Sequence, residues 1–319
     1  MAEFELIKKF FVRATPLRQD VVLGIGDDCA VVTLPPKNQL AITTDTLVSG
    51  VHFPLDALAY DIGYKALAVN LSDLAAMGAM PAWITLSLTL PNVDENWLSE
   101  FSRGLFELAD RYQIQLIGGN MARGPLAVTI AAHGFLPEGK LLKRSGAKVD
   151  NLVYVTNTLG DAGLALQFLN RKIAVKHIFQ KNILEKFYHP EARIVIGEKI
   201  RDVASAAIDI SDGLAADLNH LLEASSVGAV IQVDRLPLSE ALKTSVSTEV
   251  ALDFALNAGE DYELCFTVAP EHAKIIESIA KETHCTITCI GKITAGRTLD
   301  LQFENGKKYD GKIAGYQHF

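Results

Sequence analysis

The sequence predicts an α+β protein of two domains, each built of a mixed, largely antiparallel sheet packed with helices. Its 319 residues are enough for two domains of ordinary size. Helical and strand patterns mix in both halves without the strict alternation of a parallel, doubly wound sheet. Between the halves, Pro137-Glu-Gly-Lys140 interrupts the pattern with turn residues. We therefore expect one domain over residues 1–137 and a second over 138–319.

The elements of the first half follow from the spacing of its apolar residues. Apolar side chains recur at helical intervals from Phe4 to Phe11, and Asp94 precedes a long helical stretch as a candidate N-cap. Short β-branched runs between turn residues are typical of strands. The predicted elements are helices over 3–13, 61–77 and 94–112, and strands over 21–25, 29–34, 40–44, 83–90, 115–117 and 127–135.

The second half shows the same mixture. Gly160 follows a short apolar run and opens a helical pattern, whereas 176–188 is a polar stretch. Asn305-Gly306 between two short runs is a hairpin signal. The predicted strands are 152–156, 206–210, 228–233, 263–268, 286–290, 299–303 and 308–312. The predicted helices are 160–170, 190–203 and 270–282, and a further helix begins at 211–213.

Charge and hydropathy exclude several classes of function. The 30 Lys and Arg residues against 38 Asp and Glu residues give a net charge of −8, and no basic block stands out, so we expect no nucleic-acid partner. Residues Met1 to Arg13 show no uninterrupted apolar run behind a basic head, so we expect no secretory leader, and no apolar run in the sequence is long enough to span a bilayer. We expect a cytoplasmic protein with no membrane partner.

The cysteines show no metal-binding spacing. Cys265, Cys285 and Cys289 form no Cys-x-x-Cys pair, so they are interpreted as small buried hydrophobic residues. Cys29 directly follows Asp28, which leaves a reactive thiol as an alternative, although no base is visible beside it.

The most informative feature is a set of carboxylates placed among small residues in five separate segments. Hard cations such as Mg²⁺ take oxygen ligands from a few carboxylates, from water and from substrate phosphates, so dispersed acids beside Gly, Ser and Thr indicate phosphoryl chemistry. Neither a Rossmann nor a Walker motif occurs. Taken alone, each segment could also be a turn, a capping residue or an edge strand. The segments are Gly24-Ile-Gly-Asp-Asp28, Thr43-Thr-Asp-Thr46, Asn70-Leu-Ser-Asp-Leu74, Asp209-Ile-Ser-Asp-Gly213 and Gly259-Glu-Asp261.

Two of these segments have a specific physical interpretation. Asp73 lies in an almost entirely apolar helical stretch, where a charged side chain needs a partner and a metal ion is one such partner. Ser211 and Asp212 lie at a strand-to-helix junction, where free backbone N–H groups and the helix dipole attract phosphate. An N-cap at Ser211 or Asp212 is the alternative, and both interpretations can hold together.

The ordered set of motifs resembles the thiamine-monophosphate kinase family, within the aminoimidazole ribonucleotide synthetase-like superfamily. The resemblance covers nearly the whole chain, and its fold is the two-domain α+β arrangement expected above. The motifs that carry it are Gly26-Asp-Asp28, Thr44-Asp-Thr46 with His52-Phe53, Asn70 to Ala79, Arg144-Ser-Gly146, Asp209 to Leu214, Gly259 to Leu264 and Gly315-Tyr-Gln-His-Phe319.

The resemblance implies a function and a set of site residues. The family transfers the γ-phosphoryl group of ATP directly to thiamine monophosphate, giving thiamine diphosphate, with several Mg²⁺ ions and no covalent phosphoenzyme. It also implies a homodimer in which the N-terminal halves pair their sheets. The implied magnesium ligands are Asp28, Thr43, Thr44, Asp45, Asp73, Asn120, Asp209 and Asp212; the ATP contacts are Gly119, Asn120, Arg144 and Ser211; the thiamine phosphate contacts are His52, Glu260 and Tyr316.

One departure from the family pattern bears on catalysis. Asn120 stands where the family has a magnesium-binding Asp, and an amide oxygen can ligate Mg²⁺ but carries no charge. The alternative to a kinase is therefore a nucleotide- or thiamine-phosphate-binding homologue with reduced or lost catalysis. A selenophosphate synthetase is disfavoured, because no Gly-rich segment with a cysteine precedes Gly26-Asp-Asp28.

Overall fold

The structure is a computed structural model that describes residues 3–13, 18–313 and 315–316. Its chain forms two compact units. The first contains Met1–Leu74 and Ala79–Gly139, and the second contains Ala75–Gly78 and Lys140–Phe319. Among the described residues, no helix combines the length and the apolar character needed to cross a bilayer.

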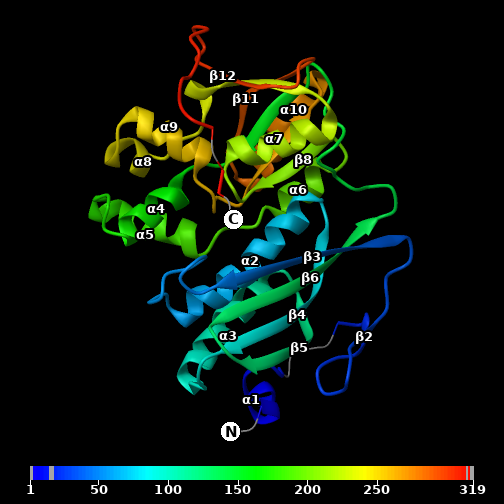
Figure 1. Cartoon of the computed structure of the whole chain (residues 1–319). Coiled ribbons are helices and arrows are strands. Elements are labelled where there is room, and N and C mark those ends of the chain that lie inside the picture. Colours follow the sequence, from blue (N-terminus) through cyan, green and yellow to red (C-terminus); the bar gives the residue numbers. More distant parts are fainter. Residues whose placement is uncertain (1–2, 14–17, 314, 317–319) are drawn as a thin grey trace. The chain divides into compact units, whose positions relative to one another are not determined.

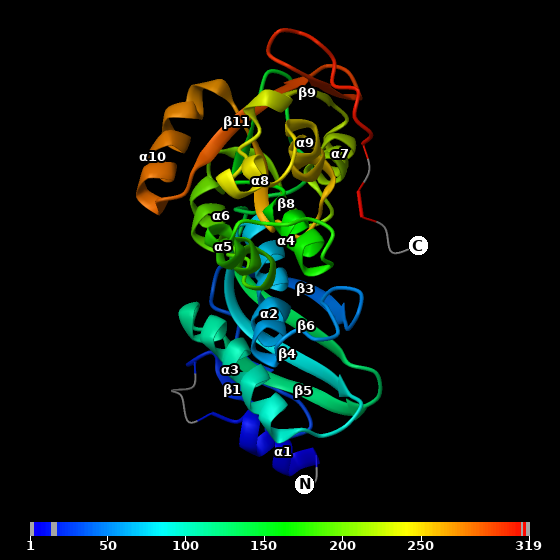
Figure 2. The same ribbon diagram turned by 90° about the vertical axis from the view of Figure 1, so that its left-hand side faces the viewer.

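The first unit is built on a four-stranded sheet in the order β3-β6-β4-β5. β3 (Asn38–Val48) and β4 (Met80–Leu90) pair antiparallel with β6 (Ala127–Pro137), and β4 pairs parallel with β5 (Gln115–Arg123). Two helices, α2 (Ala59–Ala76) and α3 (Glu95–Arg111), cover one face of this sheet (Figures 1 and 2).

Two glycines set the crossing of these helices. A Cβ atom on Gly63 of α2 would lie 2.1 Å from the Phe101 carbonyl oxygen, and one on Gly104 of α3 would lie 2.0 Å from the Tyr60 carbonyl oxygen. The two backbones therefore touch directly, as only glycine permits. At the start of α3, the predicted N-cap is confirmed, since the Asp94 carboxylate accepts the N–H groups of Asn96 and Trp97.

The other face of the sheet is only partly covered. A two-stranded ribbon of β1 (Val21–Leu23) and β2 (Val31–Val32) packs on Trp83 and Phe135, and α1 (Glu3–Phe10) follows the N-terminus. The Trp83 indole donates to the Asp20 carboxylate at 3.0 Å. Along β3 this face stays open, and its exposed residues are Leu40, Ile42, Thr44 and Thr46.

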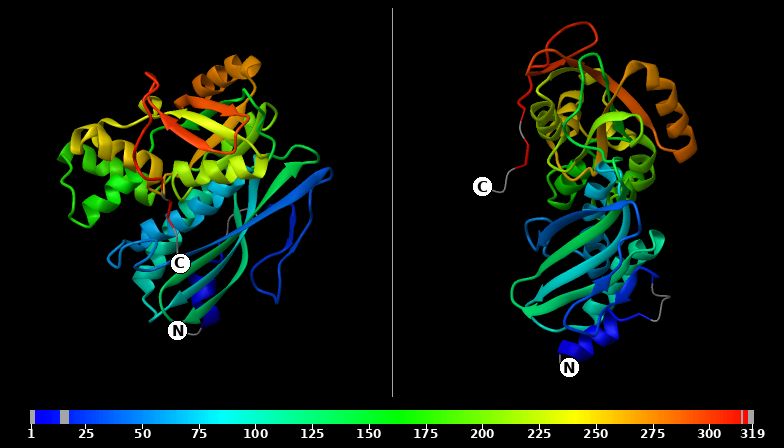
Figure 3. Two further views of the ribbon diagram at one scale, coloured as in Figure 1. Left: turned by 45° about the horizontal axis from the view of Figure 1, so that its top comes forward. Right: turned by 90° about the vertical axis from the view of Figure 1, so that its right-hand side faces the viewer.

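The second unit contains a six-stranded sheet in the order β12-β9-β11-β7-β10-β8, antiparallel except for β12 against β9. Its core packs α7 and α9 on one face, while α10 lies on the other (Figure 3). The elements are β7 (Leu152–Thr156), β8 (Ala204–Ile210), β9 (Gly228–Gln232), β10 (Glu263–Val268), β11 (Ile287–Thr294), β12 (Leu299–Gln302), α4 (Asp161–Leu169), α5 (His177–Tyr188), α6 (Ile194–Ile200), α7 (Leu214–Ser225), η1 (Val233–Arg235), α8 (Glu240–Ser245), α9 (Thr248–Asn257), η2 (Pro270–His272) and α10 (Ala273–Thr283).

The predicted class and most elements are confirmed, although α6, β1 and β2 are shorter than predicted and further differences occur. β3 and β5 run several residues beyond their predicted ends, because both are held in register by long neighbouring strands. The polar stretch 176–188 is the helix α5, whose Ile183 and Phe187 are buried. The short helices α8 and α9 were not predicted. Of the expected hairpin after β12, only a bridge between Gln302 and Lys308 forms.

Candidate active site

The predicted site residues divide between the two units. Those in the first unit are Asp28, Thr43, Thr44, Asp45, His52, Asp73, Gly119 and Asn120, and those in the second are Arg144, Asp209, Ser211, Asp212, Glu260 and Tyr316. The last three residues of the C-terminal motif, 317–319, lie outside the described residues.

One group of site residues joins β3 to α2. The Thr43 hydroxyl on β3 bonds to Oδ2 of Asp73, which projects from the last turns of α2. One turn earlier on α2, the buried Asn70 accepts the main-chain N–H of Asp45 at 3.2 Å and donates to the Ala66 carbonyl at 3.0 Å. Because residues two apart on a strand share a face, Thr43 and Asp45 both lie on the helix-covered side of the sheet.

Asp45 therefore lies inside a strand, not after the end of one as the sequence suggested. Thr44 points the other way: its neighbours across the ladder are on the open face, and its side chain is exposed. The hydroxyls of Thr43 and Thr44 thus cannot serve the same ion. Only the main chain of Thr44 is available on the side that carries Asp45.

A second group lies around a cavity at the β5 edge of the sheet. This cavity has a volume of about 760 Å³. Its lining includes the predicted residues Asp28, Gly119 and Asn120, together with Cys29 and Lys8. Gly119 is required by the packing, since a Cβ there would lie 1.9 Å from the Leu86 carbonyl oxygen. Asn120 is exposed and stands opposite Ser87 in the parallel pair.

These two groups occupy opposite edges of one sheet. The register places Asp45 beside Ile130, Leu86 and Gly119 in a row that crosses all four strands. Three strand spacings separate the row's ends by about 14 Å. Since Mg²⁺ binds its ligands at about 2 Å, Asp45 and Asn120 of one chain cannot ligate the same ion.

His52 lies in the loop that links β3 to α2. Its Nδ1 accepts the Val48 main-chain N–H at 3.0 Å, so a neutral ring carries its proton on Nε2. The buried Lys65 of α2 approaches the His52 carbonyl at 3.5 Å. The loop is therefore anchored to both elements that carry the first group.

In the second unit the structure brings several predicted residues together. The N–H of Glu260 donates to the Ser211 carbonyl at 2.8 Å, and the N–H of Tyr316 donates to the Asp212 carbonyl at 3.1 Å. Glu260 has a left-handed backbone, φ 74°, and Gly259 lies so close to Ser211 that a Cβ would meet its carbonyl oxygen at 2.4 Å. Two of the three predicted thiamine phosphate residues, Glu260 and Tyr316, are thus bound to the main chain of Ser211 and Asp212.

The backbone N–H groups at 211–213 are not free, which corrects the expectation that they attract phosphate. Ser211, Asp212 and Gly213 all donate to Oδ2 of Asp217, at 3.0, 3.0 and 3.1 Å. Burial raises the pKa of the Asp217 carboxyl to about 7, although these N–H groups act in the opposite direction. Asp217 was missed because nothing in its local sequence distinguishes it; its spacing of four to six residues from the junction is the available signal.

A buried ionic network holds the turn that carries Glu260. Glu263 and Arg193, both almost fully buried, form two hydrogen bonds of 2.6 and 2.7 Å, and Thr156 donates to Glu263 at 2.6 Å. The neighbouring Asp261 accepts the Gly160 N–H at 2.8 Å. Burial raises the pKa of Asp261 well above its ordinary value despite that hydrogen bond. Asp261 belongs to one of the predicted carboxylate segments, whereas Thr156 and Arg193 were not singled out by the sequence.

The remaining predicted residues of the second unit differ in exposure. Asp209 is buried at the end of β8, opposite Leu264. Arg144 is exposed in the loop before β7, whose main chain is bound by the hydroxyl of Ser225. Cys265 is buried, which confirms its interpretation as a buried hydrophobic residue, whereas Cys285 and Cys289 are only half-buried. Burial nevertheless raises the pKa of both of these thiols.

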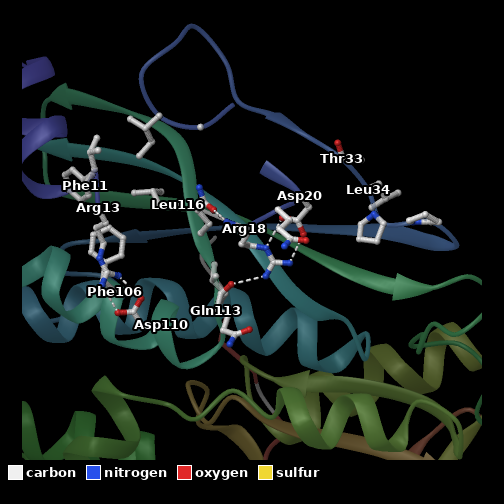
Figure 4. A pocket seen from close by; sticks show the side chains of 18 residues that line it. Phe11, Arg13, Arg18, Asp20, Thr33, Leu34, Phe106, Asp110, Gln113 and Leu116 are labelled. Carbon is white, nitrogen blue, oxygen red and sulfur yellow. Dashed lines mark hydrogen bonds and ion pairs between the residues drawn. The ribbon is translucent and has the colours of Figure 1, made fainter. Parts of the chain in front are cut away.

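A further cavity of about 1050 Å³ in the first unit contains none of the predicted residues (Figure 4). Its two guanidinium groups already have carboxylate partners. Arg18 binds Asp20 and the Gln113 carbonyl, and Arg13 binds both oxygens of Asp110. Both arginines are therefore paired with carboxylates of the first unit.

The donor set fits a hard cation. Among the described residues, no group of three or more His, Cys, Asp or Glu side chains forms a complete protein cage for a metal. What is present is oxygen: the hydroxyl and carboxylate of Thr43 and Asp73, and Asp45 on the same face. Magnesium characteristically uses one or two carboxylates and takes its other ligands from water and phosphates.

Two family domains and a solved structure show which class of protein the chain resembles. Residues 26–136 match the AIR synthase related protein N-terminal domain, and residues 148–304 match the corresponding C-terminal domain. A solved structure of thiamine-monophosphate kinase from Stenotrophomonas maltophilia, 42% identical, superimposes with a TM-score of 0.86 and covers 92% of this chain and 93% of that one.

The chain belongs to the thiamine-monophosphate kinase family. The thiamine-monophosphate kinase of Escherichia coli K12 is 48% identical over 318 residues, which is 99% of this chain and 98% of the relative. A structure described as AaThiL complexed with AMPPCP and TMP is 32% identical, with a TM-score of 0.79 and 92% of each chain covered. The resemblance found in the motifs is therefore confirmed over the whole length.

Proposed function

We propose that this protein is a thiamine-phosphate kinase, which transfers the γ-phosphoryl group of ATP directly to the phosphate of thiamine monophosphate to give thiamine diphosphate and ADP. The observation that carries this conclusion is the near full-length identity to thiamine-monophosphate kinases, together with the fold shared with a relative complexed with AMPPCP and TMP. The motif residues of the first unit lie in two groups, and in the second unit the motifs of Ser211, Glu260 and Tyr316 are joined by main-chain hydrogen bonds.

Phosphoryl transfer of this kind requires alignment and charge neutralisation more than covalent chemistry. The attacking phosphate oxygen is already ionised near neutral pH, because the second pKa of a phosphate monoester is about 6. A general base is therefore unnecessary. Gly119, Asn120, Arg144 and Ser211 are proposed to contact ATP, and His52, Glu260 and Tyr316 to contact thiamine monophosphate. Arg144 would pair with phosphate oxygens through its fixed, planar donors.

Magnesium is part of the proposal. The residues that would hold it are Asp28, Thr43, Thr44, Asp45, Asp73, Asn120, Asp209 and Asp212. When bound, Mg²⁺ neutralises phosphate charge and aligns the reacting groups. The chain's own contribution is to fix these oxygens: Thr43 orients Asp73, Asn70 holds the main chain of Asp45, and Asp217 orders the segment of Asp212.

A homodimer is also proposed, as is a cytoplasmic location, where ATP is supplied. Support for the dimer comes from β3, which is an edge strand and exposes Ile42 at 62% and Leu40 at 39% on the open face of the sheet. The Asp45 and Asn120 groups lie at opposite edges of the sheet, which gives a second reason. A second copy of the chain could bring its Asn120 edge to the Asp45 edge of the first copy. We expect Ile42→Glu to shift the protein from dimer to monomer by light scattering, and an unchanged dimer mass would contradict this interface.

Incubation with ATP, Mg²⁺ and thiamine monophosphate tests the activity directly, with thiamine diphosphate as the product to be detected. A binding protein without catalysis is not favoured, given the identity to named kinases along the full chain. Calorimetry that shows tight binding of both ligands with no product under any metal condition would nevertheless replace the kinase by that alternative.

A further inference from the structure

Helix α7 (Leu214–Ser225) carries one polar side chain near each end that binds the main chain of a neighbouring loop. Near its start, Asp217 accepts the N–H groups of Ser211, Asp212 and Gly213. At its end, Ser225 binds the loop of Arg144. Both loops contain residues proposed to contact ATP, so one rigid element connects them.

The contacts of Ser225 use its whole hydrogen-bonding capacity. Its Oγ accepts the N–H groups of Gly146 and Ala147, both at 3.1 Å, and donates to the Arg144 carbonyl at 3.0 Å. A serine hydroxyl has one donor and two acceptor positions, so all three are occupied by one loop. A residue that only capped the helix would not need this arrangement.

The opposite side of the same loop is fixed by β8. The Ala207 N–H donates to the Lys143 carbonyl at 3.0 Å. Gly146 has φ +124°, and a Cβ there would lie 2.4 Å from the Ser205 carbonyl oxygen. The loop is therefore clamped between β8 and α7. Since the Arg144 side chain is itself exposed, the position of its guanidinium depends on this clamp.

Helix α7 cannot easily move. Leu218 and Leu221 are fully buried in the core against the sheet. An α-helix rises 1.5 Å per residue, so Asp217 and Ser225 are held about 12 Å apart along its axis. We propose that Asp217 and Ser225 are positioning residues, which set the spacing between the Arg144 loop and the Ser211 segment and thereby determine the affinity for ATP. This inference rests on the proposed assignment of Arg144 and Ser211 to the nucleotide.

The test is a steady-state comparison of full-length variants with ATP and thiamine monophosphate varied in turn. Ser225→Ala removes all three contacts. Because two of them are exposed and water can replace the hydroxyl there, we expect the KM for ATP to rise about three- to tenfold, the net contribution of one or two hydrogen bonds. Its KM for thiamine monophosphate and its urea midpoint should change by much less. Ser225→Thr keeps a hydroxyl and should restore most of the ATP affinity.

Controls separate the possible outcomes. Ser226→Gly changes the next residue, which is exposed and left-handed at φ 56°, and should leave KM for ATP unchanged. Asp217→Ala should raise KM for ATP more than Asp217→Asn, which keeps an acceptor oxygen. If Arg144→Ala raises KM for ATP while Ser225→Ala does not, the positioning role is wrong although the ATP contact stands. If Arg144→Ala also has no effect on KM for ATP, the nucleotide assignment fails and the inference fails with it.

Discussion

The predicted site residues of the two units differ in how far they are buried and held by hydrogen bonds. In the second unit, the predicted segment at 209–213 is held by buried groups, with Asp217 and Glu263 almost inaccessible to solvent. In the first unit, Asp28 and Asn120 are exposed, and Asp45 and Asp73 are only half-buried on the far edge of the sheet. The comparison indicates that the second unit is organised by its own hydrogen bonds, whereas the first leaves its oxygen donors open to cations and reactants.

The largest effect should come from breaking the buried ion pair of the second unit. Glu263→Gln removes the buried counter-charge of Arg193, which keeps only the exposed Glu191 at 2.8 Å, and we expect the free energy of unfolding in urea to fall by about 3 kcal/mol. The matched control is Glu95→Gln in the first unit, which removes the exposed pair with Lys9 and should cost less than about 1 kcal/mol. Similar losses in both variants would abolish the contrast between the units.

Loss of a carboxylate in the first unit should affect catalysis more than stability. We expect Asp73→Asn to lower kcat at least tenfold, about 1.4 kcal/mol in the barrier, because a proposed metal ligand loses its charge. Glu100→Gln, a change to an exposed carboxylate on α3, should leave kcat within about twofold. An undiminished rate for Asp73→Asn would remove Asp73 from the proposed metal ligands.

A smaller effect is expected at Asn120. Asn120→Asp introduces the charge that the family pattern has there, and we expect it to raise activity or to lower the Mg²⁺ concentration for half-maximal rate by a few-fold, on the order of 1 kcal/mol. Asn92→Asp adds the same charge to an exposed residue elsewhere in the unit and should do neither. If neither quantity changes in Asn120→Asp, the amide oxygen already serves, or another group does.

The smallest effect is a pH dependence in the second unit. The folded-state pKa of Asp261 is raised above its ordinary 3.8, so its contribution to stability is complete below that pH and is lost as pH rises through the folded pKa. Asp261→Asn cannot ionise and keeps an oxygen for the Gly160 N–H. We expect the stability of wild type relative to this variant to decline from pH 5 to pH 8 in urea titrations. A constant difference would show that Asp261 is already ionised in the folded protein at pH 5, which would contradict a pKa well above its ordinary value.

The spacing of apolar residues predicted the helices and strands that are specified by local features of the sequence. Asp94 caps α3 as expected, and the apolar repeat of α2 fixed that helix to within two residues. The helix α5 was missed because only two of its residues are buried, so its polar surface concealed the repeat. β3 was predicted too short because Thr43 to Thr46 look like a strand end, whereas pairing with β6 extends the strand.

The motifs identified the proposed reactant contacts, but they did not reveal what holds them. Asp217 and Ser225 act through main-chain hydrogen bonds, and Ser225 and Glu263 bind groups some 70 or more residues away in the sequence. The opposite-edge placement of Asp45 and Asn120 depends on strand order, which no local pattern specifies. Such relations become visible only when the fold brings the segments together.

The glycine contact between α2 and α3 has a consequence for which substitutions this protein can accept. Gly63 and Gly104 lie on the covered side of the sheet, and any side chain at either position meets a carbonyl oxygen of the other helix. Because α2 also carries Asn70 and Asp73, a methyl group added there would displace these side chains from β3. Random mutagenesis screened for activity should therefore recover inactive variants in the helices that cover the first sheet, at residues that contact no reactant.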